Sequence, residues 1–170
     1  MSPRLFALDQ GFPQPIVQSL SEYLEDEVAL RPIAAIDPRL TENMDDWQIL
    51  LALHHHAEPW DGLITTDSGM LALPRELAVV LQTKLSLVVV LESGHDPVKA
   101  TGILLAQISG ICKRNVPNRG QIWALRTVEK RPEDPWDQLH ALAERRGVER
   151  AELWEDARLS AEQLAHDPLA

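Results

Sequence analysis

The sequence predicts one α/β domain in three layers (α/β/α), with a mostly parallel, doubly wound β-sheet at its centre and a helical tail after it. Short apolar segments with the character of strands alternate along the chain with amphipathic segments of helical periodicity. This alternation is typical of parallel sheets. The segment 85–91 is almost entirely aliphatic, as expected for a strand that helices cover on both faces. The length of 170 residues suits one domain with an appendage.

The individual elements follow this alternation in order. The expected strands are 4–8, 28–36, 63–66, 85–91 and 121–128. The expected helices are 14–24, one from 45 to about 58, one from 74, and 97–112. Gly11 and Pro13 break the chain between the first strand and the first helix, and Asp37-Pro38 ends the second apolar run.

The last segment, 132–170, differs in composition from the domain at 1–131. Pro132 and Pro135 mark the boundary, and beyond it ten acids stand against four arginines. Apolar residues recur there as an intermittent helical face. Three roles stay open for this tail: packing on the domain, self-association as a homodimer, or binding of a protein partner through its apolar face.

The charge distribution bears on whether the protein binds nucleic acid. The formal net charge of −10 disfavours a phosphate-rich ligand, because affinity for phosphates comes largely from Lys and Arg. The segment 112–131, however, contains six basic residues and one acid. Lys113, Arg114 and Arg119 are therefore candidate contacts to an RNA backbone, with Trp123 as a candidate stacking ring. The alternative is a solvated surface beside a core tryptophan.

The cysteine content and the hydropathy pattern predict a cytoplasmic protein. The single cysteine, Cys112, excludes an intramolecular disulfide and fits a reducing compartment. No apolar run approaches the roughly 18 residues needed to span a bilayer, so we expect neither a membrane segment nor a secretion signal. No glycine-rich phosphate-binding motif occurs, and a nucleotide cofactor is not expected.

Two aspartates directly follow predicted strands and are the first candidates for a functional site. Ligands of a parallel sheet bind beyond the carboxyl ends of its strands, and Asp9 and Asp67 stand there before glycine-containing turns. Asp46 is the third candidate, because it shares a helical face with apolar residues. Its neighbour Asp45, with Gln48 three residues later, fits a capping box at the start of the same helix.

The three aspartates together point to a bound cation. Carboxylates gathered at one edge of a sheet repel one another unless a cation lies between them. Hard divalent ions prefer oxygen ligands, so the pattern predicts Mg²⁺ or Mn²⁺ as cofactor. For each aspartate taken alone, a turn, cap or helix-dipole role is the alternative. Thr65 or Thr66 is a candidate to orient Asp67 or a bound water, and Thr66 is also a candidate substrate contact; strand propensity explains both threonines equally well.

Three segments resemble the successive motif blocks of PIN-like domains. They are Leu8-Asp9-Gln10-Gly11-Phe12-Pro13, Asp46-Trp47-Gln48-Ile49-Leu50 and Asp61-Gly62-Leu63-Ile64-Thr65-Thr66-Asp67-Ser68-Gly69-Met70-Leu71. The resemblance covers residues 4–91. It implies that Asp9, Asp46 and Asp67 bind Mg²⁺ or Mn²⁺ and hydrolyse RNA phosphodiesters. It also implies the toxin of a toxin–antitoxin pair, with an antitoxin protein as partner.

The chain departs from the PIN-like pattern beside two of these acids. Gln10 and Gly11 stand where many relatives have an acid and an asparagine, and Ser68 and Gly69 stand where many have another acid. Two alternatives therefore stay open: a PIN-like binding or scaffold protein without catalysis, and a metal-dependent phosphatase of small phosphate esters. Asp61 is a candidate to replace a missing acid, with a role at the strand entry as its alternative.

The histidines are weaker candidates. His54, His55 and His56 are adjacent on a predicted helix and point in different directions, which does not suit chelation of one ion. His95 follows the aliphatic strand and is expected near the active edge.

Overall fold

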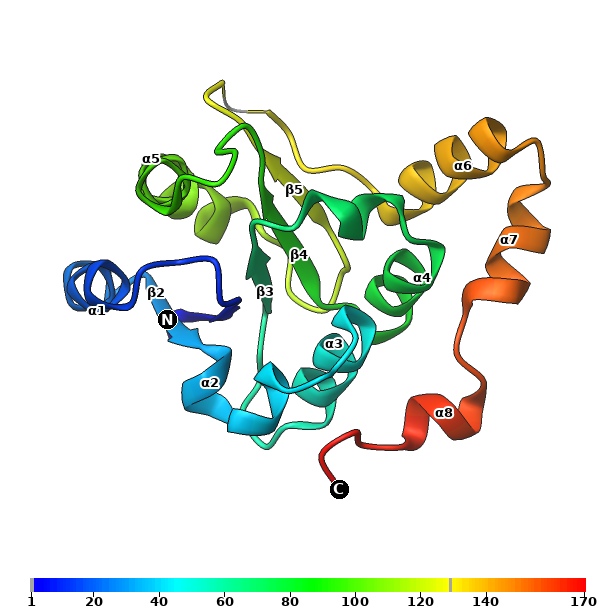
Figure 1. Ribbon diagram of the computed structural model, residues 1–170, viewed down its shortest axis with the longest axis horizontal. Coiled ribbons are helices and arrows are strands. Elements are labelled where there is room, and N and C mark those ends of the chain that lie inside the picture. Colours follow the sequence, from blue (N-terminus) through cyan, green and yellow to red (C-terminus); the bar gives the residue numbers. More distant parts are fainter. Residues whose placement is uncertain (1, 129) are drawn as a thin grey trace.

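A sheet of five parallel strands lies at the centre of the computed structural model, which describes residues 2–128 and 130–170 (Figure 1). The strands are β1 (Arg4–Leu8), β2 (Val28–Pro32), β3 (Gly62–Thr65), β4 (Ser86–Val90) and β5 (Ile122–Leu125). Their order is β2-β1-β3-β4-β5, and every neighbouring pair is parallel. The predicted α/β class with a parallel sheet is confirmed.

Helices cover both faces of this sheet (Figure 1). In chain order the helical elements are α1 (Gln14–Tyr23), α2 (Ile33–Ile36), η1 (Pro38–Thr41), α3 (Asp46–His55), η2 (Ser68–Ala72), α4 (Pro74–Thr83), α5 (Pro97–Arg114), α6 (Pro135–Arg146), α7 (Arg150–Ala157) and α8 (Ala161–Ala165). Phe6 and Leu8 of β1 pack on the face with α1 and α5, whereas Ala7 packs on the face with α3 and α4. The period of two in a strand thus divides the core into two apolar layers.

Two element boundaries differ from those predicted. The apolar run 28–36 is a strand only as far as Pro32, and Ile33–Ile36 form one helical turn. Proline cannot donate to a ladder and is tolerated here because β2 is an edge strand. Helix α3 ends at His55, since the backbone of His56 is extended, with φ −63° and ψ 150°. It is therefore shorter than the helix predicted to reach about residue 58.

The strands approach each other closely at Gly62, the first residue of β3. A Cβ atom at this position would lie 2.0 Å from the carbonyl oxygen of Ser86 in β4. A backbone oxygen in a paired strand cannot move aside without breaking the pairing, so glycine is required there.

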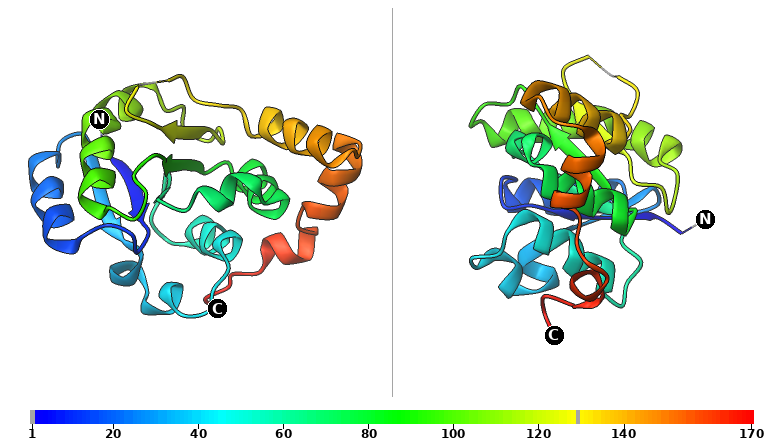
Figure 2. Two further views of the ribbon diagram at one scale, coloured as in Figure 1. Left: turned by 45° about the horizontal axis from the view of Figure 1, so that its top comes forward. Right: turned by 90° about the vertical axis from the view of Figure 1, so that its right-hand side faces the viewer.

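The tail is helical, as predicted, and packs against the domain. Helices α6 and α7 contact α4, and the chain then runs past α3 to its C-terminus (Figures 1 and 2). Leu139 and Leu142 are buried in the same apolar layer as α3 and α4. The side chain of Gln82 in α4 accepts a hydrogen bond from the N–H of Leu159 at 2.9 Å and donates one to its carbonyl at 3.0 Å. Of the three roles left open for the tail, packing on the domain is the one this arrangement shows.

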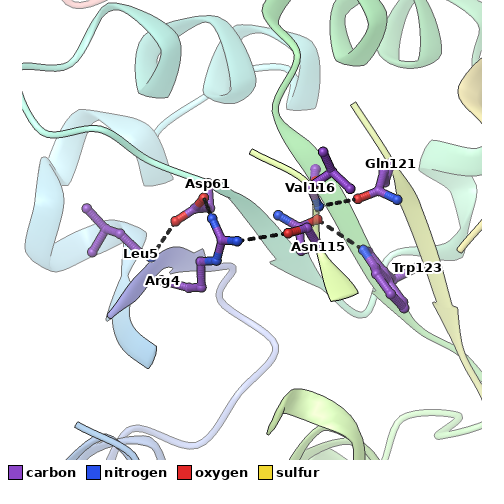
Figure 3. Close-up of polar contacts among 8 residues, drawn as sticks. Arg4, Leu5, Asp61, Asn115, Val116, Gln121 and Trp123 are labelled. Atoms are coloured by element: carbon purple, nitrogen blue, oxygen red, sulfur yellow. Dashed lines mark hydrogen bonds and ion pairs between the residues drawn. The ribbon is translucent and has the colours of Figure 1, made fainter. Parts of the chain in front are cut away.

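The amino edge of the sheet is held by a paired carboxylate (Figure 3). Asp61 accepts a hydrogen bond from the guanidinium of Arg4 at 3.2 Å and another from the backbone N–H of Leu5 at 2.8 Å. Asp61 therefore fixes the entry into β3 against the start of β1. It lies at the opposite end of the strands from Asp9 and Asp67 and does not replace a missing acid there.

Asn115 extends this contact network across the sheet (Figure 3). Its carbonyl oxygen accepts a hydrogen bond from Arg4 at 2.8 Å, and its side-chain oxygen accepts one from the indole N–H of Trp123 at 3.2 Å. The hydroxyl of Ser86 donates to the same side-chain oxygen at 2.7 Å. These buried polar groups are satisfied by one another, which fastens β1, β4 and β5 at their starts.

Among the described residues, no helix is long and apolar enough to cross a membrane.

Candidate active site

The three predicted aspartates all stand at the carboxyl edge of the sheet. Asp9 follows β1, and its backbone N–H donates to the carbonyl of Ile64 at 2.9 Å, which continues the pairing of β1 with β3. Asp67 comes two residues after the end of β3. Helix α3 leads back toward the start of β3, so its first residue, Asp46, stands at the edge where Asp9 and Asp67 stand.

The hydroxyl of Thr65, the last residue of β3, joins two of these acids. It donates a hydrogen bond to Oδ2 of Asp9 at 2.8 Å and accepts one from the backbone N–H of Asp67 at 3.0 Å. Thr65 is 0% exposed, so both contacts are shielded from water. A valine in the same strand would fill the same space but could not make either bond. Thr65 or Thr66 was predicted to orient Asp67 or a bound water. The side chain that the Thr65 hydroxyl contacts is that of Asp9, and its contact with Asp67 is to the backbone N–H.

Asp9 and Asp67 also perform the turn roles considered as alternatives. Oδ1 of Asp9 accepts a hydrogen bond from the N–H of Gln10 at 2.7 Å, and Oδ1 of Asp67 accepts one from the N–H of Gly69 at 2.8 Å. Within the described residues, Oδ2 of Asp67 accepts no hydrogen bond. Each turn contact therefore fixes one carboxylate oxygen in place, and Asp67 keeps its second oxygen for another partner.

The charges of Asp9 and Asp67 affect the pKa of Asp46. It lies half-buried at the first turn of α3, after the predicted capping box in which Gln48 accepts a hydrogen bond from the N–H of Asp45 at 2.9 Å. Burial raises the pKa of the Asp46 carboxyl, and the negative charges of Asp67, Asp9 and Asp45 raise it further. The carboxylates are thus close enough to repel one another, as predicted for side chains that converge on one rim.

Among the described residues, no cation forms an ion pair with the acids of this rim. Asp9, Asp46 and Asp67 make no ion pair with a described Lys, Arg or His. In the same part of the chain, no three His, Cys, Asp or Glu side chains form a ready-made set of metal ligands. Mg²⁺, however, is usually bound by one or two carboxylates, several waters and the phosphates of a substrate. The acidic rim fits that kind of loosely held ion and does not fit a closed protein cage.

Sequence reasoning missed a fourth acid beside this rim. Glu76, in the first turn of α4, is only 6% exposed. Burial raises the pKa of its carboxyl, and the charges of Asp46 and Asp45 raise it further. From the sequence alone Glu76 looks like an acid placed to favour the helix dipole. Its burial depends on how α4 packs, which no local pattern specifies.

A guanidinium near the rim was also missed. Arg75 lies with its Cζ 5.6 Å from the ring centroid of Trp47, and Trp47 is the residue after Asp46. A cation held over an aromatic face in this way keeps a defined position. Arg75 is therefore a basic side chain near the acids that could contact a phosphate.

The predicted basic contacts lie elsewhere. Helix α5 begins after β4 at the carboxyl edge and returns the chain to the amino edge, where Lys113 and Arg114 end it and Arg119 follows. Cζ of Arg114 is 5.2 Å from the ring centroid of Trp123, but Trp123 is 1% exposed. Trp123 is thus a core residue, as one of the two interpretations of the sequence proposed, and it does not offer a stacking ring for a nucleobase. The structure does not bring Lys113, Arg114 and Arg119 to the acids, whereas Arg126 follows β5 at the carboxyl edge and is paired with Glu92.

The remaining candidates take different places. Thr66 is half-buried beside Gly11 at the carboxyl edge, and His95 is exposed in the loop after β4. His55 contacts the tail, with Nε2 2.7 Å from the carbonyl oxygen of Leu164. His56 accepts a hydrogen bond from the N–H of Glu58 at 3.1 Å. The adjacent histidines therefore act separately, as their spacing predicts.

These features define a parallel α/β domain with an acidic rim at the carboxyl ends of β1 and β3. A comparison of the chain with known proteins finds no matching protein-family model, no matching curated protein and no matching solved structure. The fold class is therefore shown by the structure itself, and the resemblance to PIN-like domains rests on the motif residues.

Proposed function

We propose that this protein is a PIN-like, metal-dependent endoribonuclease, in which Asp9, Asp46 and Asp67 hold Mg²⁺ or Mn²⁺. The observation that carries the proposal is the convergence of three acids, from three separate segments, at the edge of a parallel sheet without an ion pair among the described residues. This edge is the usual ligand site of such sheets. Uncompensated carboxylates cost stability, so their presence favours a function that needs them.

Each residue of the rim has a distinct task in this reaction. A bound divalent cation would supply an activated water and neutralise the charge that develops on the phosphate. Thr65 holds the Asp9 carboxylate in one orientation, and Asp67 is held by its own turn. Asp46, at the start of α3, would supply the third carboxylate for the cation. Arg75 supplies a positive charge for the phosphate that approaches the acids.

The proposed partners are an RNA substrate and an antitoxin protein. The tail is already packed on α4, with Leu139 and Leu142 buried. An antitoxin, or a second copy of this chain in a homodimer, would therefore bind a surface other than the buried face of the tail. The acidic rim itself is a suitable target for a basic inhibitory segment, because such a segment would take the place of the cation.

A second candidate function is a PIN-like binding or scaffold protein without catalysis. Gln10, Gly11, Ser68 and Gly69 favour it, because they stand where additional acids or amides are expected. The lack of a ready-made three-ligand set among the described residues also favours it. A phosphatase of small phosphate esters would use the same metal-assisted hydrolysis as a ribonuclease, but on a shorter substrate. The length of substrate that the rim accepts distinguishes the phosphatase from the ribonuclease.

Titration calorimetry with Mn²⁺ and cleavage of a structured RNA test the proposal. We expect saturable Mn²⁺ binding and Mn²⁺-dependent cleavage, both abolished in Asp9→Asn and in Asp67→Asn. The matched control is Asp156→Asn, which removes an exposed charge on α7 far from the rim and should change neither measurement. Binding without cleavage of any phosphoester would identify the scaffold protein. Faster turnover of a generic small phosphoester than of RNA would identify the phosphatase.

A further inference from the structure

A small pocket adjoins the acidic rim at the carboxyl edge. Its volume is about 220 Å³, and the connection between β4 and α5 forms much of its wall. Gly11 and Thr66, which follow β1 and β3, form the side toward the acids. Pockets for whole drug-sized ligands measure about 300 to 1,000 Å³. This one suits a single group of a longer ligand whose neighbouring group lies at the acids.

One hydroxyl that lines this pocket has no partner among the described residues. Ser93 is 6% exposed and lines the pocket, and its side chain makes no hydrogen bond to any other described residue. Its oxygen is not among the fully buried atoms of the described residues that lack a partner, so the hydroxyl is open to the pocket. Ser93 is therefore a group that a ligand in this pocket can satisfy, both as donor and as acceptor.

The charge of the pocket argues for a neutral group. No Lys or Arg is among the described residues that line it. Its one carboxylate, Asp96, already accepts hydrogen bonds from the N–H groups of Val98 and Lys99 at 3.0 and 3.1 Å, which cap α5. A phosphate would meet no cation here and would approach this carboxylate. Hydroxyl groups of a sugar suit the remaining lining of hydroxyls and an imidazole.

Two glycines keep the pocket open. A Cβ at position 11 would lie 2.4 Å from Oγ1 of Thr66, so the close approach of the two loops requires Gly11. Gly94 has φ +57°, a left-handed conformation that other residues adopt at a cost, and nothing lies within 4 Å of where its Cβ would be. The loop after β4 therefore bends away and leaves space beside Ser93 and His95.

We infer that this pocket is the subsite for the ribose next to the scissile phosphate, and that it selects RNA over DNA through Ser93 and Thr66. The inference rests on the proposed ribonuclease function and adds the sugar specificity of the same site. A ribose 2′-hydroxyl both donates and accepts a hydrogen bond, so it complements the unpartnered hydroxyl of Ser93. A deoxyribose would offer Ser93 no such partner.

Paired oligonucleotides test this subsite. One substrate is all RNA, and the other has a single 2′-deoxy nucleotide beside the cleavage position. For the wild type we expect kcat/KM about tenfold lower on the deoxy substrate, the factor expected for one lost hydrogen bond. For Ser93→Ala we expect a similar loss on RNA and no further loss on the deoxy substrate. The control Ser19→Ala removes an exposed hydroxyl on α1 and should keep the wild-type ratio.

A binding measurement separates this inference from the proposed function. Fluorescence anisotropy of labelled RNA and DNA of one sequence, in EDTA, needs no cleavage. A preference for RNA that Ser93→Ala removes supports the subsite even when no cleavage occurs, and that outcome would refute the ribonuclease alone. Cleavage of RNA with equal turnover of the deoxy substrate overturns the subsite and leaves the ribonuclease standing. Equal binding of RNA and DNA, or binding of neither, also overturns the subsite.

Discussion

Asp61 at the amino edge and the three acids of the rim at the carboxyl edge have opposite surroundings. At the amino edge, Asp61 has an arginine partner and a backbone donor, and Glu58 nearby is paired with Arg31. At the carboxyl edge, Asp46 lies half-buried among other acids, and no described Lys, Arg or His forms an ion pair with it. Evolution of a stable fold alone would produce the first arrangement and would not maintain the second. The three unpaired acids of the rim are therefore where a ligand is expected.

The largest expected effect is the loss of RNA cleavage in Asp46→Asn. Loss of a charge that acts on the reacting phosphate should lower RNA cleavage by on the order of 100-fold or more. In EDTA the free energy of unfolding should stay unchanged or rise, because the substitution removes repulsion from Asp9 and Asp67. Cleavage assays and urea unfolding in parallel check both parts. A variant that cleaves normally but unfolds easily would show that Asp46 is structural.

Asp61→Ala should have the reverse effect. It leaves the Arg4 guanidinium and the N–H of Leu5 without their partner, in a partly buried position. We expect the free energy of unfolding to fall by about 1–3 kcal/mol, the usual cost of unsatisfied buried groups. Cleavage of RNA, measured well below the melting temperature, should not change. A loss of activity without a loss of stability would remove the distinction between the two edges.

Thr65→Val probes how precisely the unpaired edge is held. The substitution keeps the shape of the side chain but removes the hydrogen bonds to Asp9 and to the N–H of Asp67. Cleavage should fall about tenfold, as for other residues that orient a ligand to a metal, and the loss should appear as weaker Mn²⁺ binding in calorimetry. The control Thr41→Val, at a half-buried residue, removes a hydroxyl that bonds only the backbone of Pro38. Unchanged Mn²⁺ affinity in Thr65→Val would contradict the orienting role.

The sheet and the position of the acids could be predicted from the sequence, because periodicity and strand-end placement are local signals. The location of the basic stretch could not be read from composition. In a parallel sheet, a helix after a strand returns to the amino edge, so Lys113 and Arg114 at the end of α5 lie opposite to Asp9. The burial of Glu76 also depends on packing between helices, which leaves no local pattern.

The pH dependence of stability distinguishes the edges more finely. The pKa values of Asp46 and Glu76 are raised above 3.8 and 4.5, so the folded protein holds these protons more tightly than the unfolded chain. Their contribution to stability is present below those ordinary values and is lost as the pH rises through the raised ones. In EDTA, Asp46→Asn should therefore gain stability relative to the wild type between about pH 3 and about pH 7. The pKa of Glu58 is lowered by Arg31, so Glu58→Gln should lose stability relative to the wild type over the same range. Urea unfolding at several pH values measures both differences, and the same sign for the two variants would contradict the comparison.

The smallest effect is expected for the double variant Lys113→Ala, Arg119→Ala. Both side chains are exposed at the amino edge, and the length of the strands separates them from the acids. If RNA is cut at the carboxyl edge, kcat/KM should stay within about twofold of the wild type, the range of a screened distant charge. Arg75→Gln is the matched comparison, because it removes one charge beside Trp47 and should cost about tenfold. A larger loss in the double variant than in Arg75→Gln would mean that RNA wraps from one edge of the sheet to the other. The amino edge would then belong to the substrate path as well as to the framework of the fold.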